Sequence, residues 1–305
     1  MIIKKFKTLI TIMMFATFAL PIYCQTVQDD CATKEFYNYS PDFQWRQLDK
    51  ILPEQENLVF DVYWKFVKVG KGTLEIKGLE TVNGRKAYHI YSQAKSAPFF
   101  DTFFKVRDTN ESWLDTESLC SLRYFTNISE GGWKKYEQLD FNHENKQFAR
   151  NDDGTMKYGD TVRWVQDVIS SFYYIRTMDL KVGDEYVFDA HSGDDTWPLK
   201  TKVIGKETVK VKAGTFDCLI LEPSLREDAG LFKAKGKLKV WVTNDEKKMP
   251  VKMKSKIPVG SISAELSTYK NNESEMEKEF FSQEFDDETE PEDDFFTQET
   301  NEINF

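Results

Sequence analysis

Residues able to do chemistry are scarce in this chain of 305 residues, which has three histidines and four cysteines. One segment, HSGDD, brings a histidine close to carboxylates, namely His191, Asp194 and Asp195. A zinc site would require further histidine or cysteine ligands at short spacing, and an EF-hand calcium loop would be longer. The segment is therefore a weak candidate for a metal site, and a polar hairpin turn is the preferred interpretation.

No familiar catalytic motif is present. The sequence lacks GxSxG, HExxH, P-loop and GxGxxG patterns, which disfavours the enzyme classes built on them. We expect no cofactor and assign no catalytic residue. Carboxylates are abundant, so a carboxylate pair of the kind used by glycoside hydrolases stays open as an alternative, with envelope glycans as the substrate.

The first 24 residues have the pattern of a secretory signal peptide. Lysines precede an apolar run from Leu9 to Leu20, and Pro21 follows. The run is shorter than the about 20 residues of a membrane-spanning helix. Cleavage near Cys24 and Gln25 predicts an exported, periplasmic protein. Lipidation of Cys24 is the less favoured alternative, because the preceding Tyr23 is not small.

Three cysteines follow the leader. Cys31 lies in an N-terminal arm, residues 25–57, which shows no sustained periodicity. In an exported protein an odd number of cysteines allows one disulfide with one free thiol, or no disulfide. If a pair forms, Cys120 with Cys218 is the preferred candidate.

The acidity of the chain is concentrated at its C-terminal end. The net charge is −10, yet residues 273–305 contain 14 acidic residues and one lysine, so the part between leader and tail is close to neutral. A neutral body disfavours nucleic acid as a partner. The composition predicts that residues 271–305 are disordered. Phe280–Phe281 and Phe295–Phe296 make this tail a candidate motif for an envelope protein partner, although a solubilising role is preferred.

Residues 58–270 have the periodicity of an antiparallel β-sheet. From Leu58 to Phe66 every second residue is apolar, and Gly70 and Gly72 are expected to end that strand. Asn83–Gly84 predicts a hairpin turn. Several strands alternate lysines with aliphatic residues, which indicates a sheet with one face in water. Expected strands include three that matter below: Phe103–Asp108, Leu199–Ile204 and Thr208–Lys212.

One amphipathic helix is expected between two blocks of strands. The helical wheel predicts residues Thr161–Met178, with Asp160 or Thr161 as the N-cap and Gly183 at the end. The two strand blocks also resemble each other: GLETV at 78–82 matches GKETV at 205–209. WLD at 113–115 likewise matches WVT at 241–243. We interpret this as a pseudo-duplication with the helix near its midpoint.

Arg176 falls within the apolar stripe of this helix. A buried arginine needs a partner or an opening to water. It therefore either ties the helix to the sheet, which is the preferred interpretation, or forms the floor of a ligand cavity. The other candidates for lining such a cavity are Trp64, Phe172 and Tyr173.

Ordered motifs run through most of the body: FDVYW (60–64) followed by Gly70, QDVIS (166–170) leading to YYIR (173–176), VGD (182–184), AGTF (213–216), and GKLKVW (236–241) followed by Pro250. On these motifs the chain resembles the exported bacterial family called domain of unknown function 3108, over about Leu58 to Tyr269. The leader is similar to those of Bacteroidota. The resemblance implies export and no established reaction. By architecture, it implies a likeness to envelope proteins that spiral a broken β-sheet around one helix, related to lipoprotein carriers.

The predicted fold is mainly β: a curved antiparallel sheet, a β-spiral or half-barrel, wrapped around one long central helix. The leading functional hypothesis is a monomeric, non-enzymatic envelope protein that binds an apolar or lipid-linked ligand, or a partner protein. The alternatives are an envelope glycan hydrolase, and an assembly or scaffold subunit recruited through residues 273–305.

Overall fold

The computed structural model describes residues 36, 39–50, 52–224, 238–257 and 260–270. The predicted leader, Cys31 and the acidic tail lie outside these residues, so the expectations for them stay predictions. Within the described part of the chain, strands are the main secondary structure, and the helices there are two short ones, α2 (Pro98–Phe104) and α3 (Val168–Arg176).

The strands of the described residues belong to one antiparallel sheet of 14 strands. Their order across the sheet is β8-β7-β6-β5-β4-β3-β2-β1-β14-β13-β12-β11-β10-β9, so the first strand pairs with the last. The strands are β1 (Glu56–Trp64), β2 (Val67–Val82), β3 (Arg85–Ser96), β4 (Arg107–Asp115), β5 (Ser121–Glu130), β6 (Trp133–Asn142), β7 (Gln147–Asp152), β8 (Thr155–Asp160), β9 (Glu185–Ser192), β10 (Asp195–Val211), β11 (Gly214–Pro223), β12 (Leu238–Thr243), β13 (Pro250–Ile257) and β14 (Gly260–Lys270).

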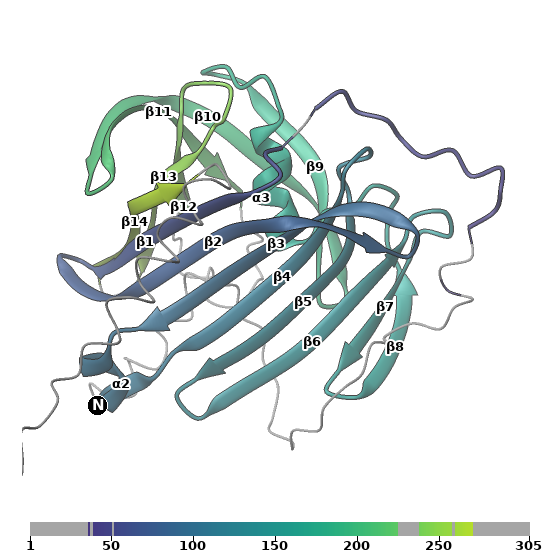
Figure 1. The fold of residues 1–305 in the computed structure, drawn as a ribbon, viewed down its shortest axis with the longest axis horizontal. Coiled ribbons are helices and arrows are strands. Elements are labelled where there is room, and N and C mark those ends of the chain that lie inside the picture. Colours follow the sequence, from purple (N-terminus) through teal and green to yellow (C-terminus); the bar gives the residue numbers. More distant parts are fainter. Residues whose placement is uncertain (1–35, 37–38, 51, 225–237, 258–259, 271–305) are drawn as a thin grey trace, which may run out of the picture.

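The sheet curves strongly but does not close, because its edge strands β8 and β9 do not pair with each other (Figure 1). The segment between them contains α3, which lies within the curve. Side chains of α3 belong to core clusters on three sides: Tyr173 packs with β1–β4 and β14, Ile175 with β10–β12, and Ile169 with β5–β7. The predicted arrangement, a sheet curved around a central helix, is present in this open form.

The helix itself is much shorter than predicted. It begins after Asp167, not near Thr161, and ends before Thr177, so Gly183 does not terminate it. The reason is tertiary hydrogen bonding. Thr161 N–H donates to Lys146 O, Gln166 N–H donates to Asp189 O, and Gln166 O accepts from His191 N–H. The backbone of this segment is thus held by the neighbouring strands, which overrides its helical periodicity.

Other boundaries also differ from the pattern. The predicted strand at 103–108 instead contains the end of α2, which Pro98 starts at a position that favours proline. Strand β2 continues through Gly70 and Gly72, which were expected to end a strand, and β10 unites two predicted strands. Strand β8 was not predicted, and its six residues are mostly exposed.

Candidate apolar binding cavity

A cavity of about 210 Å³ lies between the first turns of α3 and the concave face of the sheet. Strands β1–β4 line one side and β12–β14 line the other. Most of the side chains that face it are apolar. They are Phe60, Val62, Val69, Leu74, Ala94, Val106, Val168, Ile169, Phe172, Leu238, Val240, Met253, Ile262 and Ala264.

Small residues on β2 and β3 keep this space open. A Cβ atom on Gly72 would lie 3.9 Å from both Phe60 Cβ and Val62 Cγ2, two residues of the lining, so any larger side chain there would enter the cavity. Gly70 has a different role, because a Cβ at that position would lie 2.3 Å from Lys95 O. Glycine is therefore sterically required at 70, whereas at 72 its main effect is to leave volume unfilled.

Asp108 on β4 is buried and is the one carboxylate among the described residues that line this space; the lining also includes other polar side chains, among them Gln93 and Asn110. Its Oδ1 accepts a hydrogen bond from Ser129 N–H at 2.9 Å, and its side chain also hydrogen-bonds with Glu130. Burial raises the pKa of Asp108 to about 6, against the lowering effect of these hydrogen bonds. The cavity thus has one polar group that changes charge near neutral pH.

Of the four predicted cavity residues, the structure places one in the cavity. Phe172 lines it, whereas Trp64, Tyr173 and Arg176 do not. Trp64 lies at the end of β1, where the ammonium of Lys65 is 5.8 Å from its ring centroid. The missed residue is Asp108, which occupies an inward-facing position of β4 that the sequence pattern did not distinguish from other acidic strand positions.

Arg176 ties α3 to β1 and is fully enclosed. Its Nη2 and Nη1 lie 2.7 Å and 2.8 Å from the two oxygens of Glu56, and Tyr173 Oη donates to the same carboxylate. Burial acts to lower the pKa of Arg176, but the charge of Glu56 outweighs it and the pKa is raised. This is the structural role preferred in the sequence analysis, not the floor of a cavity.

The opposite end of α3 is held by Asp167. One oxygen accepts from the backbone N–H groups of Ile169 and Ser170, and the other accepts from Ser112 Oγ and Ser121 Oγ at 2.6 and 2.5 Å. The helix start is therefore fixed to β4 and β5. Since Arg176 fixes its end to β1, both ends are tied to the wall that surrounds the cavity.

The weak metal candidate is a hairpin turn. His191 Nδ1 contacts Thr196 Oγ1 at 2.7 Å, and its Nε2 contacts Gly193 O at 3.1 Å. Asp194 pairs with Arg150 and Lys157. Burial lowers the pKa of His191 to about 4, so the ring is neutral. Among the described residues no group of three histidine, cysteine, aspartate or glutamate side chains is arranged to hold a metal ion.

The predicted disulfide is not formed. Cys120 and Cys218 are both free and buried, and they belong to separate core clusters on different parts of the sheet. Cys120 Sγ lies 3.2 Å from His143 Nε2, yet that nitrogen also lies 2.8 Å from Ser121 O and so carries the proton. Burial raises the pKa of Cys120 to about 12. The pair therefore lacks an activated thiolate.

A histidine on the outer face of the sheet makes contacts that the sequence did not reveal. His89 Nδ1 lies 2.7 Å from Glu80, its Nε2 lies 2.5 Å from Glu111, and its ring stacks on Trp113. Trp113 Nε1–H also donates to Glu80. These groups satisfy one another on the convex side and do not line the cavity.

No curated protein matches this chain. A solved structure of a beta-barrel-like protein of domain of unknown function DUF1849 from Brucella abortus aligns with a TM-score of 0.49 and 6% identity, covering 73% of this chain and all of that one. A protein with a YmcC-like fold from Bacteroides fragilis, provisionally described as exported, aligns at 0.28 and 9%, covering 74% and 99%.

A third solved structure, from Parabacteroides distasonis and provisionally described as a lipoprotein, aligns with a TM-score of 0.27 and 12% identity, covering 74% of this chain and all of that one. In the part of the chain that the structure describes, no helix has the length and apolar character to cross a membrane. The family model "Protein of unknown function (DUF3108)" matches residues 59–267, which is most of the chain, and the chain therefore belongs to this family.

Proposed function

We propose that this protein binds the apolar part of a ligand, such as one acyl chain of a lipid-linked envelope component, in the cavity beside α3. The role is non-enzymatic: the protein shelters or carries the ligand. The observation that supports it is the largely apolar lining of a space of about 210 Å³ within the curved sheet. The signal-peptide pattern of residues 1–24 agrees with a site of action in the envelope.

The volume is suited to a short apolar group. An apolar cavity of about 150 Å³ is sufficient to hold a benzene ring in a protein core. The side chains of the surrounding strands and of α3 leave this space unfilled beside a packed core, which favours a space kept for a ligand over a packing defect.

The hydrolase alternative has less support from this site. A glycosidase needs two carboxyl groups about 5–10 Å apart across the scissile bond. Asp108 is the one carboxylate among the residues that line the cavity, and its hydrogen bond to Glu130 joins the two groups directly. A largely aliphatic wall also offers few hydrogen bonds to a sugar ring.

The proposal is tested by filling the cavity. In a titration with the fluorescent fatty acid cis-parinaric acid, Gly72→Leu is expected to weaken binding about tenfold or more, because its side chain occupies the apolar space. Gly205→Leu is the matched control: this glycine also lies in a long strand, and the nearest atom to its added Cβ is Ile220 Cδ1 at 4.0 Å. The control is expected to bind like the wild type.

Extraction of the protein purified from its envelope fraction, followed by lipid mass spectrometry, identifies the natural ligand. A reproducible apolar species that is lost in Gly72→Leu and kept in Gly205→Leu supports the proposal. Equal binding of cis-parinaric acid by all three proteins, or its absence in the wild type, overturns it.

A further inference from the structure

Three phenylalanines project into solvent at one end of the sheet. Phe66, in the turn between β1 and β2, is 86% exposed, and Phe99 and Phe103 of α2 are 70% and 62% exposed. Phe99 contacts Phe103 edge-on, with ring centroids 5.6 Å apart. Exposure of large apolar side chains is unfavourable in water, so their grouping calls for a partner surface.

These residues lie on adjoining parts of the fold. The β1–β2 hairpin and α2 occupy the same end in Figure 1, and the backbone N–H of Ala97, just before α2, donates to Val69 O of β2 at 2.8 Å. The start of β14 lies next to the β1–β2 hairpin, because Lys65 N–H donates to Ser261 O at 2.8 Å. We call this region, formed by residues 65–71, 95–107, 129–135, 254–256 and 260–262, the aromatic end.

The charge of the aromatic end is of one sign. Its two acidic residues do not add negative charge to the surface: Asp101 pairs with Arg107 at 2.5 Å, and Glu130 is buried. Within its described residues every charged side chain that is exposed is a lysine, and one of these lysines, Lys68, pairs with Asp61 of β1 at 2.6 Å. The exposed lysines are Lys65, Lys68, Lys71, Lys95, Lys105, Lys134, Lys254 and Lys256.

We propose that the aromatic end docks on an anionic lipid surface, with Phe66, Phe99 and Phe103 inserted among the lipid headgroups and the lysines around them facing the lipid phosphates. Aromatic side chains that protrude from short elements insert at such an interface, and nearby lysines gain from its negative potential. The separate, projecting positions of the rings fit a deformable lipid surface better than the flat, contiguous patch of a protein interface.

The position of this end connects docking with the cavity. Val69, Gly70, Ser96 and Val106 belong to the aromatic end and also line the cavity. Docking there would bring the apolar site next to the lipids. The docking inference nevertheless rests on exposure and charge alone, so it stands or fails independently of whether a ligand occupies the cavity.

Vesicle sedimentation of the whole chain measures docking. Vesicles of equimolar phosphatidylcholine and phosphatidylglycerol are compared with vesicles of phosphatidylcholine alone. The triple variant Phe66→Ser, Phe99→Ser, Phe103→Ser is expected to reduce partitioning onto the anionic vesicles about tenfold or more. The triple variant Lys65→Gln, Lys105→Gln, Lys134→Gln replaces exposed lysines that do not line the cavity, and it is expected to weaken partitioning and its dependence on salt.

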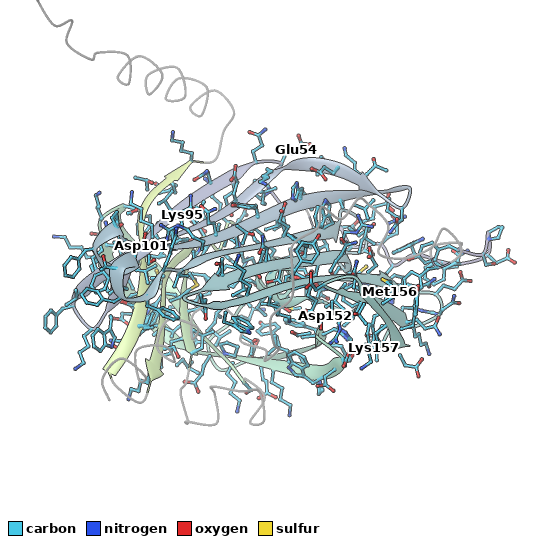
Figure 2. All side chains as sticks on the ribbon, turned by 90° about the horizontal axis from the view of Figure 1, so that it is seen from below. Glu54, Lys95, Asp101, Asp152, Met156 and Lys157 are labelled. Atoms are coloured by element: carbon cyan, nitrogen blue, oxygen red, sulfur yellow. The ribbon has the colours of Figure 1, made fainter. Side chains whose placement is uncertain are left out.

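The control removes apolar exposure elsewhere: Met156→Ser, Tyr158→Ser, Val187→Ser on the edge strands β8 and β9, where these side chains are 37%, 52% and 52% exposed. Figure 2 shows Met156 well separated from Lys95 and Asp101. This control is expected to partition like the wild type.

Hydrogen–deuterium exchange measures protection segment by segment, so it separates contacts of the aromatic end with vesicles from any binding by residues 1–24. With anionic vesicles, protection is expected at 65–71 and 97–105 and not at 153–160. Protection elsewhere, equal partitioning of the phenylalanine variant and the wild type, or equal binding to neutral vesicles would overturn the proposal. So would capture of a protein partner by this end without any vesicle binding.

Discussion

Arg176 Nη2 lies 2.7 Å from Glu56 Oε1 and Arg176 Nη1 lies 2.8 Å from Glu56 Oε2, a two-pronged ion pair in which both side chains are almost fully buried. The pair joins the last residue of α3 to the first residue of β1. Arg176 also donates to Lys247 O through Nε and Nη2. The guanidinium is therefore satisfied entirely by protein atoms and is not available to a ligand.

Replacing Arg176 with Met is expected to lower the free energy of unfolding by about 3–5 kcal/mol, because the carboxylate of Glu56 would stay buried without its partner. Binding of cis-parinaric acid by the folded variant should not change, since Arg176 does not line the cavity. Urea unfolding followed by tryptophan fluorescence measures the loss of stability.

Lys181→Met provides the control for that change. Lys181 pairs with Asp179 at 2.8 Å, but both side chains are mostly exposed, so removing the charge should leave the stability unchanged. An Arg176→Met variant as stable as the wild type, or one that loses the fatty acid while stability is kept, would contradict the structural role.

Asp108 predicts a pH dependence of stability. Its pKa is about 6 in the folded protein, above the about 3.9 of an unfolded carboxyl group, so the folded state holds this proton more tightly. The contribution of Asp108 to stability is therefore greatest below about pH 4 and is lost as the pH rises through about 6. Above that pH, a buried charge opposes folding.

Asp108→Asn removes this titration and keeps an oxygen for Ser129 N–H. The variant should gain stability relative to the wild type between about pH 4 and about pH 7.5, by on the order of 2 kcal/mol. Urea unfolding of both proteins at the two pH values measures the difference, with Glu130 kept in both. A difference between variant and wild type that stays constant across this range would show that Asp108 does not titrate there.

Filling the cavity should stabilise the protein without ligand. Gly72→Leu adds apolar contacts to Phe60 and Val62 and removes a flexible glycine from a strand, so we expect a gain of about 1–2 kcal/mol in the free energy of unfolding. Thermal unfolding of delipidated protein measures it. A gain in stability together with weaker fatty-acid binding is the signature of a cavity kept open for function, whereas a loss of stability would show that no accessible space exists at Gly72.

The sequence pattern was sufficient to predict the sheet but not the bounds of the helix. Alternating apolar residues identified most strands, because each strand buries one face against the same core. The helical wheel extended the predicted helix to Thr161, because the periodicity of apolar residues does not show which groups accept or donate the backbone hydrogen bonds. Gln166 N–H and O are both bonded to β9, and Asp167 with Ser170 forms the capping box that starts the helix.

The similarity between the two strand blocks has a counterpart in side-chain contacts. Trp113 Nε1–H donates to Glu80 Oε2 at 2.8 Å, and Trp241 Nε1–H donates to Glu207 Oε2 at the same distance. In each block the glutamate is on the first strand of a three-strand meander and the tryptophan is on the third. The strand pairing also shifts register just before Gly78 and just before Gly205.

The cavity could not be predicted from the sequence pattern. It depends on missing volume at Gly72, on the first turns of α3, and on β12–β14, which are far apart in the sequence. Two of the predicted lining residues, Tyr173 and Arg176, are large side chains of the helix itself. Both contact the buried carboxylate of Glu56, so their side chains fill the core and do not border open space.

Because Cys120 and Cys218 are both free and buried, we expect the fold not to require a disulfide between them. Burial raises the pKa of both the Cys120 and the Cys218 thiols to about 12, so neither should react with iodoacetamide in the folded state, and both should react in urea. Mass spectrometry of labelled peptides distinguishes them from the other cysteines of the chain.

Replacing Cys218 with Ala should lower the free energy of unfolding by about 1 kcal/mol through lost packing, equally with and without reductant. A disulfide-linked peptide containing Cys120 and Cys218 would contradict this expectation, and so would protection of the two thiols from iodoacetamide that reductant abolishes. Either result would require the two core clusters to lie together in a different arrangement of the sheet.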